Sequence, residues 1–168
     1  MTAASRLSLL AAVPVAAGLV GAVSAPSLAA PGVAPKSAFF ELTPTAAQVP
    51  GGGDTRGNVR AFLQLDGPRN SVCFLITWTG LKGRVTAAHL HRAPAGRTGP
   101  HHVDLVNEAA VSGKRGSLAE CVDADAARMH GMAADPDAVT AILKRPNRFY
   151  LNLHTTVYPE GARRAQLG

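Results

Sequence analysis

Two segments of the chain place histidines at the two-residue spacing of a β-strand face. His89 and His91 are two residues apart, so in an extended strand both side chains project to the same side. Much later in the chain, Tyr150, Asn152 and His154 repeat this spacing, and apolar residues alternate with them. If the two strands are neighbours, three imidazoles and an amide converge on one polar surface.

Such a surface has three interpretations that the sequence leaves open. Neutral imidazole nitrogens bind copper and zinc at about 2 Å, which makes His89, His91 and His154 candidate metal ligands. Asn152 and Tyr150 would then orient the rings from a second layer of contacts. Alternatively, these side chains satisfy one another as a polar network, or they form a patch that faces a ligand.

The sequence offers little support for hydrolase chemistry. It contains no Gly-x-Ser-x-Gly turn that would present a nucleophilic serine. Asp104 and Glu108 are too isolated to be argued as the carboxylate pair of a glycosidase. A binding or structural role is therefore favoured over an enzymatic one.

The N-terminal segment is typical of an exported protein. Arg6 precedes an apolar stretch, Leu7–Val23, and small residues follow at the positions that a signal peptidase reads. A proline and a glycine interrupt the stretch, which is shorter than the roughly 20 apolar residues of a membrane span, so we expect no transmembrane anchor after cleavage. The sequence thus predicts a signal peptide at residues 1–29, cleaved near Ala29, a flexible segment at residues 30–37 and one domain at residues 38–168 of a secreted or cell-envelope protein.

The charge of the chain limits its partners. The formal net charge is +6 at pH 7, carried by small scattered clusters of basic residues. These clusters lack the interleaved aromatic residues of a nucleic-acid platform, so no nucleic-acid binding is predicted. An extracellular protein or an anionic envelope polymer is the expected partner.

Cys73 and Cys121 are the two cysteines of the chain. In an oxidising compartment an even number of cysteines favours a disulfide, here closing a long loop. The alternative is a pair of buried thiols or of thiolate ligands.

The pattern along the chain predicts an all-β fold, an antiparallel Greek-key-like β-sandwich with one short helix. Asn58–Leu65 and Ser71–Trp78 alternate clearly and form the expected hairpin. The helix is predicted to begin with Asp135 as its cap and Pro136 in its first turn, and to end before Pro146. The other expected strands lie at residues 38–42, 86–91, 101–106, 117–122, 149–154 and 162–167.

Several of these segments together resemble the CHRD domain, a module named for chordin and found in exported bacterial proteins. The resemblance is carried by residues 48–50 before a Gly-rich turn, 86–91, 96–100, 149–155 and 159–167. It implies an antiparallel β-sandwich, an extracellular binding or structural role and no established catalytic activity.

Two positions depart from the CHRD pattern. Gln48 stands where the family usually has Glu, and His101–His102 stand where it tends to have apolar residues. The second departure brings further imidazoles near the predicted cluster, so His101 is an additional candidate ligand.

A weaker similarity, to copper/zinc superoxide dismutase, rests on the His-x-His strand and the later Gly-Pro-His. The zinc-site spacing is missing after residue 102, which argues against a two-metal centre. The predicted function is therefore a secreted, non-catalytic binding or structural module. The alternative is a copper- or zinc-binding protein, similar to superoxide dismutase, that uses His89, His91 and His154.

Overall fold

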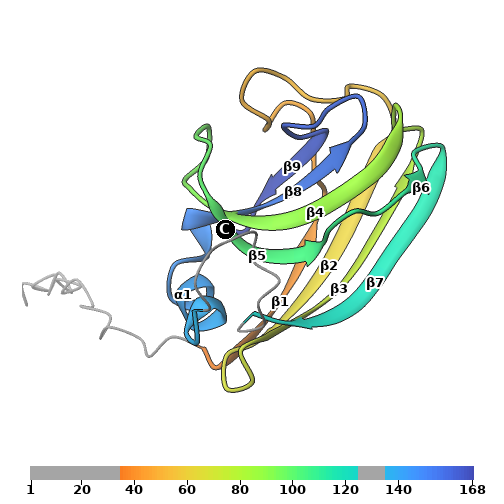
Figure 1. Cartoon of the computed structure of the whole chain (residues 1–168). Coiled ribbons are helices and arrows are strands. Elements are labelled where there is room, and N and C mark those ends of the chain that lie inside the picture. The colour runs from red at the N-terminus through yellow and green to blue at the C-terminus, as the bar shows by residue number, and fades with distance from the viewer. Residues whose placement is uncertain (1–34, 125–134) are drawn as a thin grey trace, which may run out of the picture. The chain divides into compact units, whose positions relative to one another are not determined.

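The computed structural model describes residues 35–124 and 135–168. They form two antiparallel β-sheets packed face to face, with one short helix that buries its apolar side in the same core (Figure 1). Sheet A contains, in spatial order, β1 (Ser37–Leu42), β2 (Asn58–Asp66), β3 (Ser71–Thr79) and β7 (Arg115–Asp123). Sheet B contains β5 (His101–Val106), β4 (Arg84–Arg92), β8 (Phe149–Thr155) and β9 (Arg163–Gln166), with β6 (Val111–Ser112) also paired to β4. The predicted all-β sandwich is confirmed.

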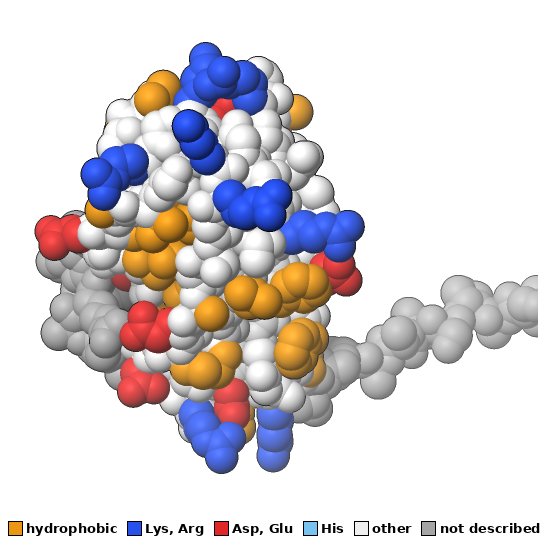
Figure 2. Space-filling view, turned by 90° about the vertical axis from the view of Figure 1, so that its right-hand side faces the viewer, with side chains coloured by type: hydrophobic (Ala, Val, Ile, Leu, Met, Phe, Trp, Pro, Cys, Tyr) orange, Lys and Arg blue, Asp and Glu red, His pale blue; other side chains and the backbone are white. Residues whose placement is uncertain are grey.

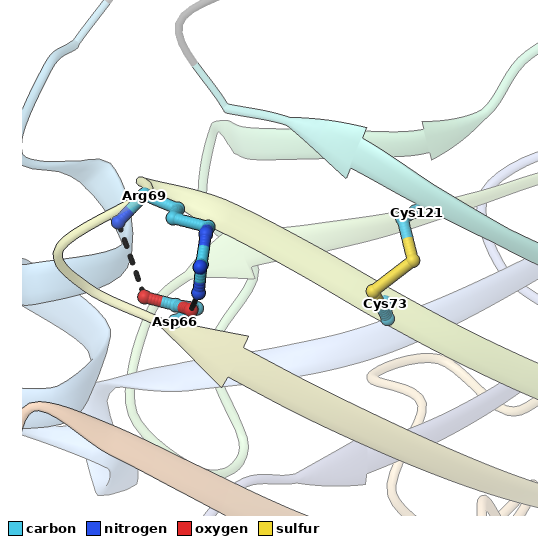
Figure 3. Close-up of a disulfide and its surroundings, with 4 residues drawn as sticks. All are labelled: Asp66, Arg69, Cys73 and Cys121. Atoms are coloured by element: carbon cyan, nitrogen blue, oxygen red, sulfur yellow. Dashed lines mark hydrogen bonds and ion pairs between the residues drawn. A yellow bond between two sulfur atoms is a disulfide. The ribbon is translucent and has the colours of Figure 1, made fainter.

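The β2–β3 hairpin follows from the alternation of its residues. Val59, Leu63 and Ile76 are among the side chains that face the core, and each is almost fully buried. At the turn, the Asp66 carboxylate accepts hydrogen bonds from the backbone N–H and the guanidinium of Arg69, at 3.1 and 2.7 Å (Figure 3). The hairpin register is therefore set both by burial and by a turn closed within itself.

The disulfide predicted from the two cysteines is confirmed. Cys73 on β3 lies directly opposite Cys121 on β7, and their sulfur atoms are bonded (Figure 3). The bridge joins two cysteines that are 48 residues apart in the sequence. It therefore fixes β7 against sheet A across a long connection.

The helix begins later than the sequence predicts. Helix α1 spans Ala138–Lys144 and is followed by a 3₁₀ turn at Pro146–Arg148. The Asp135 side chain accepts from the N–H of Asp137, an Asx turn that precedes the helix. Asn70, from the β2–β3 turn, accepts instead from the N–H of Val139 at 2.9 Å. The cap therefore comes from a distant turn, and the local sequence does not reveal it.

Pairing between distant strands determines what meets on sheet B. β4 pairs with β8, which places His89 opposite Asn152 and His91 opposite Tyr150. The juxtaposition expected from the alternating pattern of the two segments is therefore observed. β6 was not predicted. Among the described residues, no helix has the length and apolar character needed to cross a membrane.

The outer faces of the two sheets differ in exposure. On sheet A, the outward side chains Phe39 and Leu75 are 72% and 39% exposed, and Figure 2 shows hydrophobic side chains gathered on this side of the molecule. On sheet B, the outward side chains His89, Asn152 and Arg164 are all buried, at 5%, 5% and 1% exposure. Loops that bond to these side chains cover sheet B, and its outer face is therefore an enclosed polar layer.

Candidate functional site

Four imidazoles meet on the outer face of sheet B, and we call them the histidine cluster. His89 and His91 come from β4, His101 from β5 and His154 from β8. The ring centre of His89 lies 4.1 Å from that of His101 and 4.9 Å from that of His154. The ring centres of His91 and His101 are 4.5 Å apart. The four histidines named from the sequence are therefore all brought together.

A register shift between β4 and β5 brings His101 into the cluster. Leu90 pairs with Val103, and the next residue, His91, pairs with His101, which leaves His102 as an extra residue in β5. A bulge of this kind reverses the face to which the following side chain points. His102 thus turns away and contacts the carbonyl oxygen of Ala138 at 2.9 Å. A regular strand would place His101 on the same side as the core residue Val103.

Three members of the cluster have the spacing of potential metal ligands. One ring nitrogen each from His89, His91 and His101 lie within 4.8 Å of one another, the one such group found among the described residues. Nitrogens bound tetrahedrally at about 2.05 Å to one ion are about 3.4 Å apart, so small side-chain rotations would complete the site. His154 lies beside this group and contacts His89.

His91 is held with one nitrogen aimed at the cluster. Its Nδ1 donates to the carbonyl of Gly99 at 3.0 Å, which leaves the lone pair on Nε2. Nε2 is buried, and no hydrogen-bond partner for it exists in the described part of the chain. Tyr150 stacks on the ring at 4.9 Å, and its hydroxyl accepts from the Gly99 N–H. Tyr150 therefore positions both the imidazole and the loop that orients it.

Asp104 orients His101 in the same way. Its Oδ1 accepts from Nδ1 of His101 at 2.9 Å, and its side chain is almost fully buried. A carboxylate that accepts from one imidazole nitrogen raises the basicity of the other, a common arrangement around metal-binding histidines. From the sequence, Asp104 was considered only as one member of a carboxylate pair. The signal available was its position three residues after His101.

His89 and His154 lie in a chain of contacts that is short of one hydrogen. Nδ1 of His154 faces the Pro159 carbonyl at 2.8 Å, Nε2 of His154 faces Nδ1 of His89 at 3.2 Å, and Nε2 of His89 faces Oδ1 of Asn107 at 2.7 Å. These three contacts need three hydrogens, whereas two neutral imidazoles carry two. The Asn107 amide group also donates to Asp104, which opposes its rotation. In a neutral pair, one of the three contacts therefore lacks a hydrogen.

Burial keeps His89, His91 and His154 in their neutral form. The pKa of His89 is lowered to about 3 and that of His91 to about 4, mainly by burial and to a smaller extent by the neighbouring histidines. Burial also lowers the pKa of His154. At neutral pH these rings therefore have lone pairs to offer, and a metal ion would displace few protons on binding.

The polar residues around the cluster fix the loops that cover it. The Asn152 amide donates to the carbonyl of Glu160 at 3.1 Å, in the turn whose Pro159 carbonyl faces His154. The Asn152 amide therefore contacts the turn that faces His154, and its hydrogen bond is to this turn rather than to an imidazole. The Arg164 guanidinium lies 3.4 Å from the centre of the Tyr150 ring and donates to the carbonyls of Pro94 and Arg97.

Comparison with known proteins adds one finding. A family model described as the CHRD domain matches residues 39–167. No curated protein and no solved structure matches the chain.

Proposed function

The chain belongs to the CHRD domain family, and we propose that it is an exported module that binds one copper or zinc ion at the histidine cluster. CHRD domains are extracellular, and membership suggests a non-catalytic role. The Cys73–Cys121 disulfide agrees with an oxidising compartment. The predicted signal peptide at residues 1–29 lies outside the described residues and stays a prediction.

The observation that carries the metal proposal is the meeting of three imidazoles, from His89, His91 and His101, around an unsatisfied nitrogen. A buried acceptor without a donor costs about 1–3 kcal/mol. Nε2 of His91 is such an acceptor. A cation bound between the rings would satisfy this lone pair.

The proposed ligands are His89, His91 and His101, with His154 holding the His89 ring from behind. Three imidazoles without a thiolate suit zinc and copper. The ion would link β4 to β5 and thereby stabilise the sheet. Hydrogen bonds to Gly99 and Asp104 fix two of the rings, which supports a site that needs little rearrangement.

The test is metal analysis of untagged protein, followed by thermal unfolding with and without added copper or zinc. We expect one ion per chain, and a higher unfolding temperature on metal addition. His101→Gln should lose the ion, because His101 is one of the three proposed ligands. The variant should still fold, because the His101 side chain is 31% exposed. His102→Gln is the matched control, since His102 is the adjacent histidine and faces Ala138, and it should keep the ion.

A third variant, His154→Gln, identifies the ligand set. Retention of the ion with weaker affinity is expected if His154 only supports His89, whereas complete loss would make His154 a ligand, as the sequence analysis proposed. A metal-free protein whose unfolding temperature stays constant on adding either metal would refute metal binding. The cluster would then be a hydrogen-bonded polar network.

A further inference from the structure

Three loops at one end of the sandwich carry basic side chains around a single cavity. Arg56 precedes β2, Lys82 lies between β3 and β4, and Lys114 lies between β6 and β7. These residues line a cavity of about 610 Å³, which we call the basic cavity. No carboxylate is among the described residues that line it. In Figure 2, Lys and Arg side chains gather toward the top of this side of the molecule.

A buried carboxylate fixes two of these loops. Asp54 is fully buried and accepts from the backbone N–H of Arg56 at 3.0 Å and from that of Lys82 at 2.5 Å. The guanidinium of Arg163 holds the same segment from another side by donating to the carbonyls of Arg56 and Gly57. The two cationic side chains therefore start from backbone positions that are held together.

The third loop is joined to the second by the backbone. The N–H groups of Gly80 and Leu81 donate to the carbonyls of Lys114 and Gly113, both at 2.8 Å. A Cβ atom on Gly113 would lie 2.3 Å from the carbonyl oxygen of Gly83, so the close approach requires glycine. Positive charges repel one another, and the fold nevertheless holds the three basic side chains Arg56, Lys82 and Lys114 around one cavity. Such an arrangement is suited to an anionic ligand.

A groove on the outer face of sheet A lies next to the basic cavity. Three residues that line the groove are close in sequence to residues that line the cavity. Asn58 lies two positions after Arg56, Thr79 directly precedes Gly80, and Arg115 directly follows Lys114. The groove also contains the hydroxyl groups of Thr77 and Ser117. The amide and hydroxyl side chains of the groove can form hydrogen bonds with the hydroxyl groups of a sugar, next to the cations of the basic cavity. An extended ligand could therefore contact the cavity and the groove together.

We propose that this surface binds a linear anionic glycan, a carbohydrate polymer with repeated carboxylate or phosphate groups. Single-stranded nucleic acid needs aromatic platforms for its bases. Trp78 is the aromatic residue of the groove, but it is 2% exposed and its indole N–H donates to the carbonyl of Ser112. The surface shares no residue with the histidine cluster, so the two sites can be tested separately.

The test measures binding of full-length protein to oligogalacturonate by calorimetry over a range of salt concentrations. Dextran serves as the neutral glycan, inorganic polyphosphate as a phosphate polymer without sugar, and oligothymidylate of equal charge as the nucleic acid. We expect binding to oligogalacturonate that weakens with salt, no binding to dextran, and weaker binding to polyphosphate and oligothymidylate than to the glycan. Removing the three cations in Arg56→Gln, Lys82→Gln and Lys114→Gln combined should reduce the salt slope by about 2–3.

Two variants separate a built site from diffuse charge. The combined Lys144→Gln, Arg145→Gln and Arg148→Gln protein also loses three exposed cations, but away from the cavity, and should bind within about twofold of the wild type. Asp54→Asn raises the net charge by one, so diffuse attraction predicts tighter binding. If Asp54 instead holds the two loops in place for the ligand, the variant should bind more weakly. A thermal unfolding curve should first show that the variant is folded.

The proposal is overturned by equal loss in the two triple variants, by tighter binding of Asp54→Asn, or by a preference for oligothymidylate over the glycan. Absence of salt-dependent binding to oligogalacturonate overturns it as well. If Asp54→Asn does not fold, the comparison of the two triple variants decides alone. None of these outcomes depends on whether the histidine cluster binds a metal.

Discussion

Acidification from pH 7 to pH 5 should destabilise the metal-free protein by about 3–4 kcal/mol through His89 and His91 alone. Burial lowers their pKa values to about 3 and about 4, whereas in the unfolded chain both return to the ordinary value of 6.5. Below pH 6.5 the unfolded chain therefore binds protons that the folded chain does not bind. The free energy of unfolding falls as the pH falls through this range, and it is independent of these two groups well above pH 6.5.

The magnitude follows from the two pKa differences. One pKa unit corresponds to about 1.4 kcal/mol. At pH 5 an unfolded histidine is almost fully protonated while His89 and His91 in the fold remain largely neutral, so each contributes just under about 2 kcal/mol. Burial lowers the pKa values of His102 and His154 as well, and these groups act in the same direction. Ordinary Asp and Glu side chains titrate near pH 4, so this pH window reports mainly on histidines.

The assay is urea unfolding at pH 7, 6 and 5 in the presence of a chelator, followed by the fluorescence of Trp78. The His91→Gln variant should lose about half of the pH dependence attributed to the pair, because one of the two groups no longer titrates. A stability that changes by less than about 1 kcal/mol between pH 7 and pH 5 would contradict the reasoning. The folded cluster would then already hold a proton, which the contact between His89 and His154 permits.

Three further changes have defined outcomes. Replacing Cys73 and Cys121 together by Ser should lower the free energy of unfolding by about 4 kcal/mol in urea titrations, because the bridge closes a 48-residue separation; unchanged stability would contradict this. Gly161→Ala should cost about 1–3 kcal/mol, because Gly161 has φ +140° and the new Cβ would lie 2.6 Å from Oδ1 of Asn152; calorimetric melting measures it, and an unchanged melting temperature would argue against the strain. Arg164→Lys should cost about 1–3 kcal/mol in urea, because one ammonium group cannot reproduce a guanidinium fork that donates to two loop carbonyls; an equally stable Lys variant would mean that the fork is dispensable.

The strands and the meeting of β4 with β8 could be predicted, because two-residue alternation records directly which side chains share a face. His89, His91 and His154 were therefore found from spacing alone. The disulfide between Cys73 and Cys121 followed from compartment and cysteine count. These features could be predicted because they depend on residue type and on short-range spacing along the chain.

The rest of the site depends on contacts between segments far apart in sequence. A register shift determines that His101 faces the cluster and His102 does not, and no residue type in β5 announces it. The partner of Asn107 became visible only once β5 was paired with β4. In the same way, the cap of α1 comes from Asn70, which no helix-start pattern includes. Tertiary placement, rather than local preference, decides each of these cases.

The enclosure of the histidine cluster depends on β9, the last strand in the chain order. Its Arg164 holds the loop over the cluster, and its Gln166 side chain donates to the carbonyls of Ala93 and Asn147 and its backbone N–H to Gln48. During synthesis from the N-terminus, β4, β5 and β8 emerge before this strand can close over them. The imidazoles thus become enclosed only when β9 docks, whereas the His101 side chain, at 31% exposure, stays accessible to an ion in the folded protein.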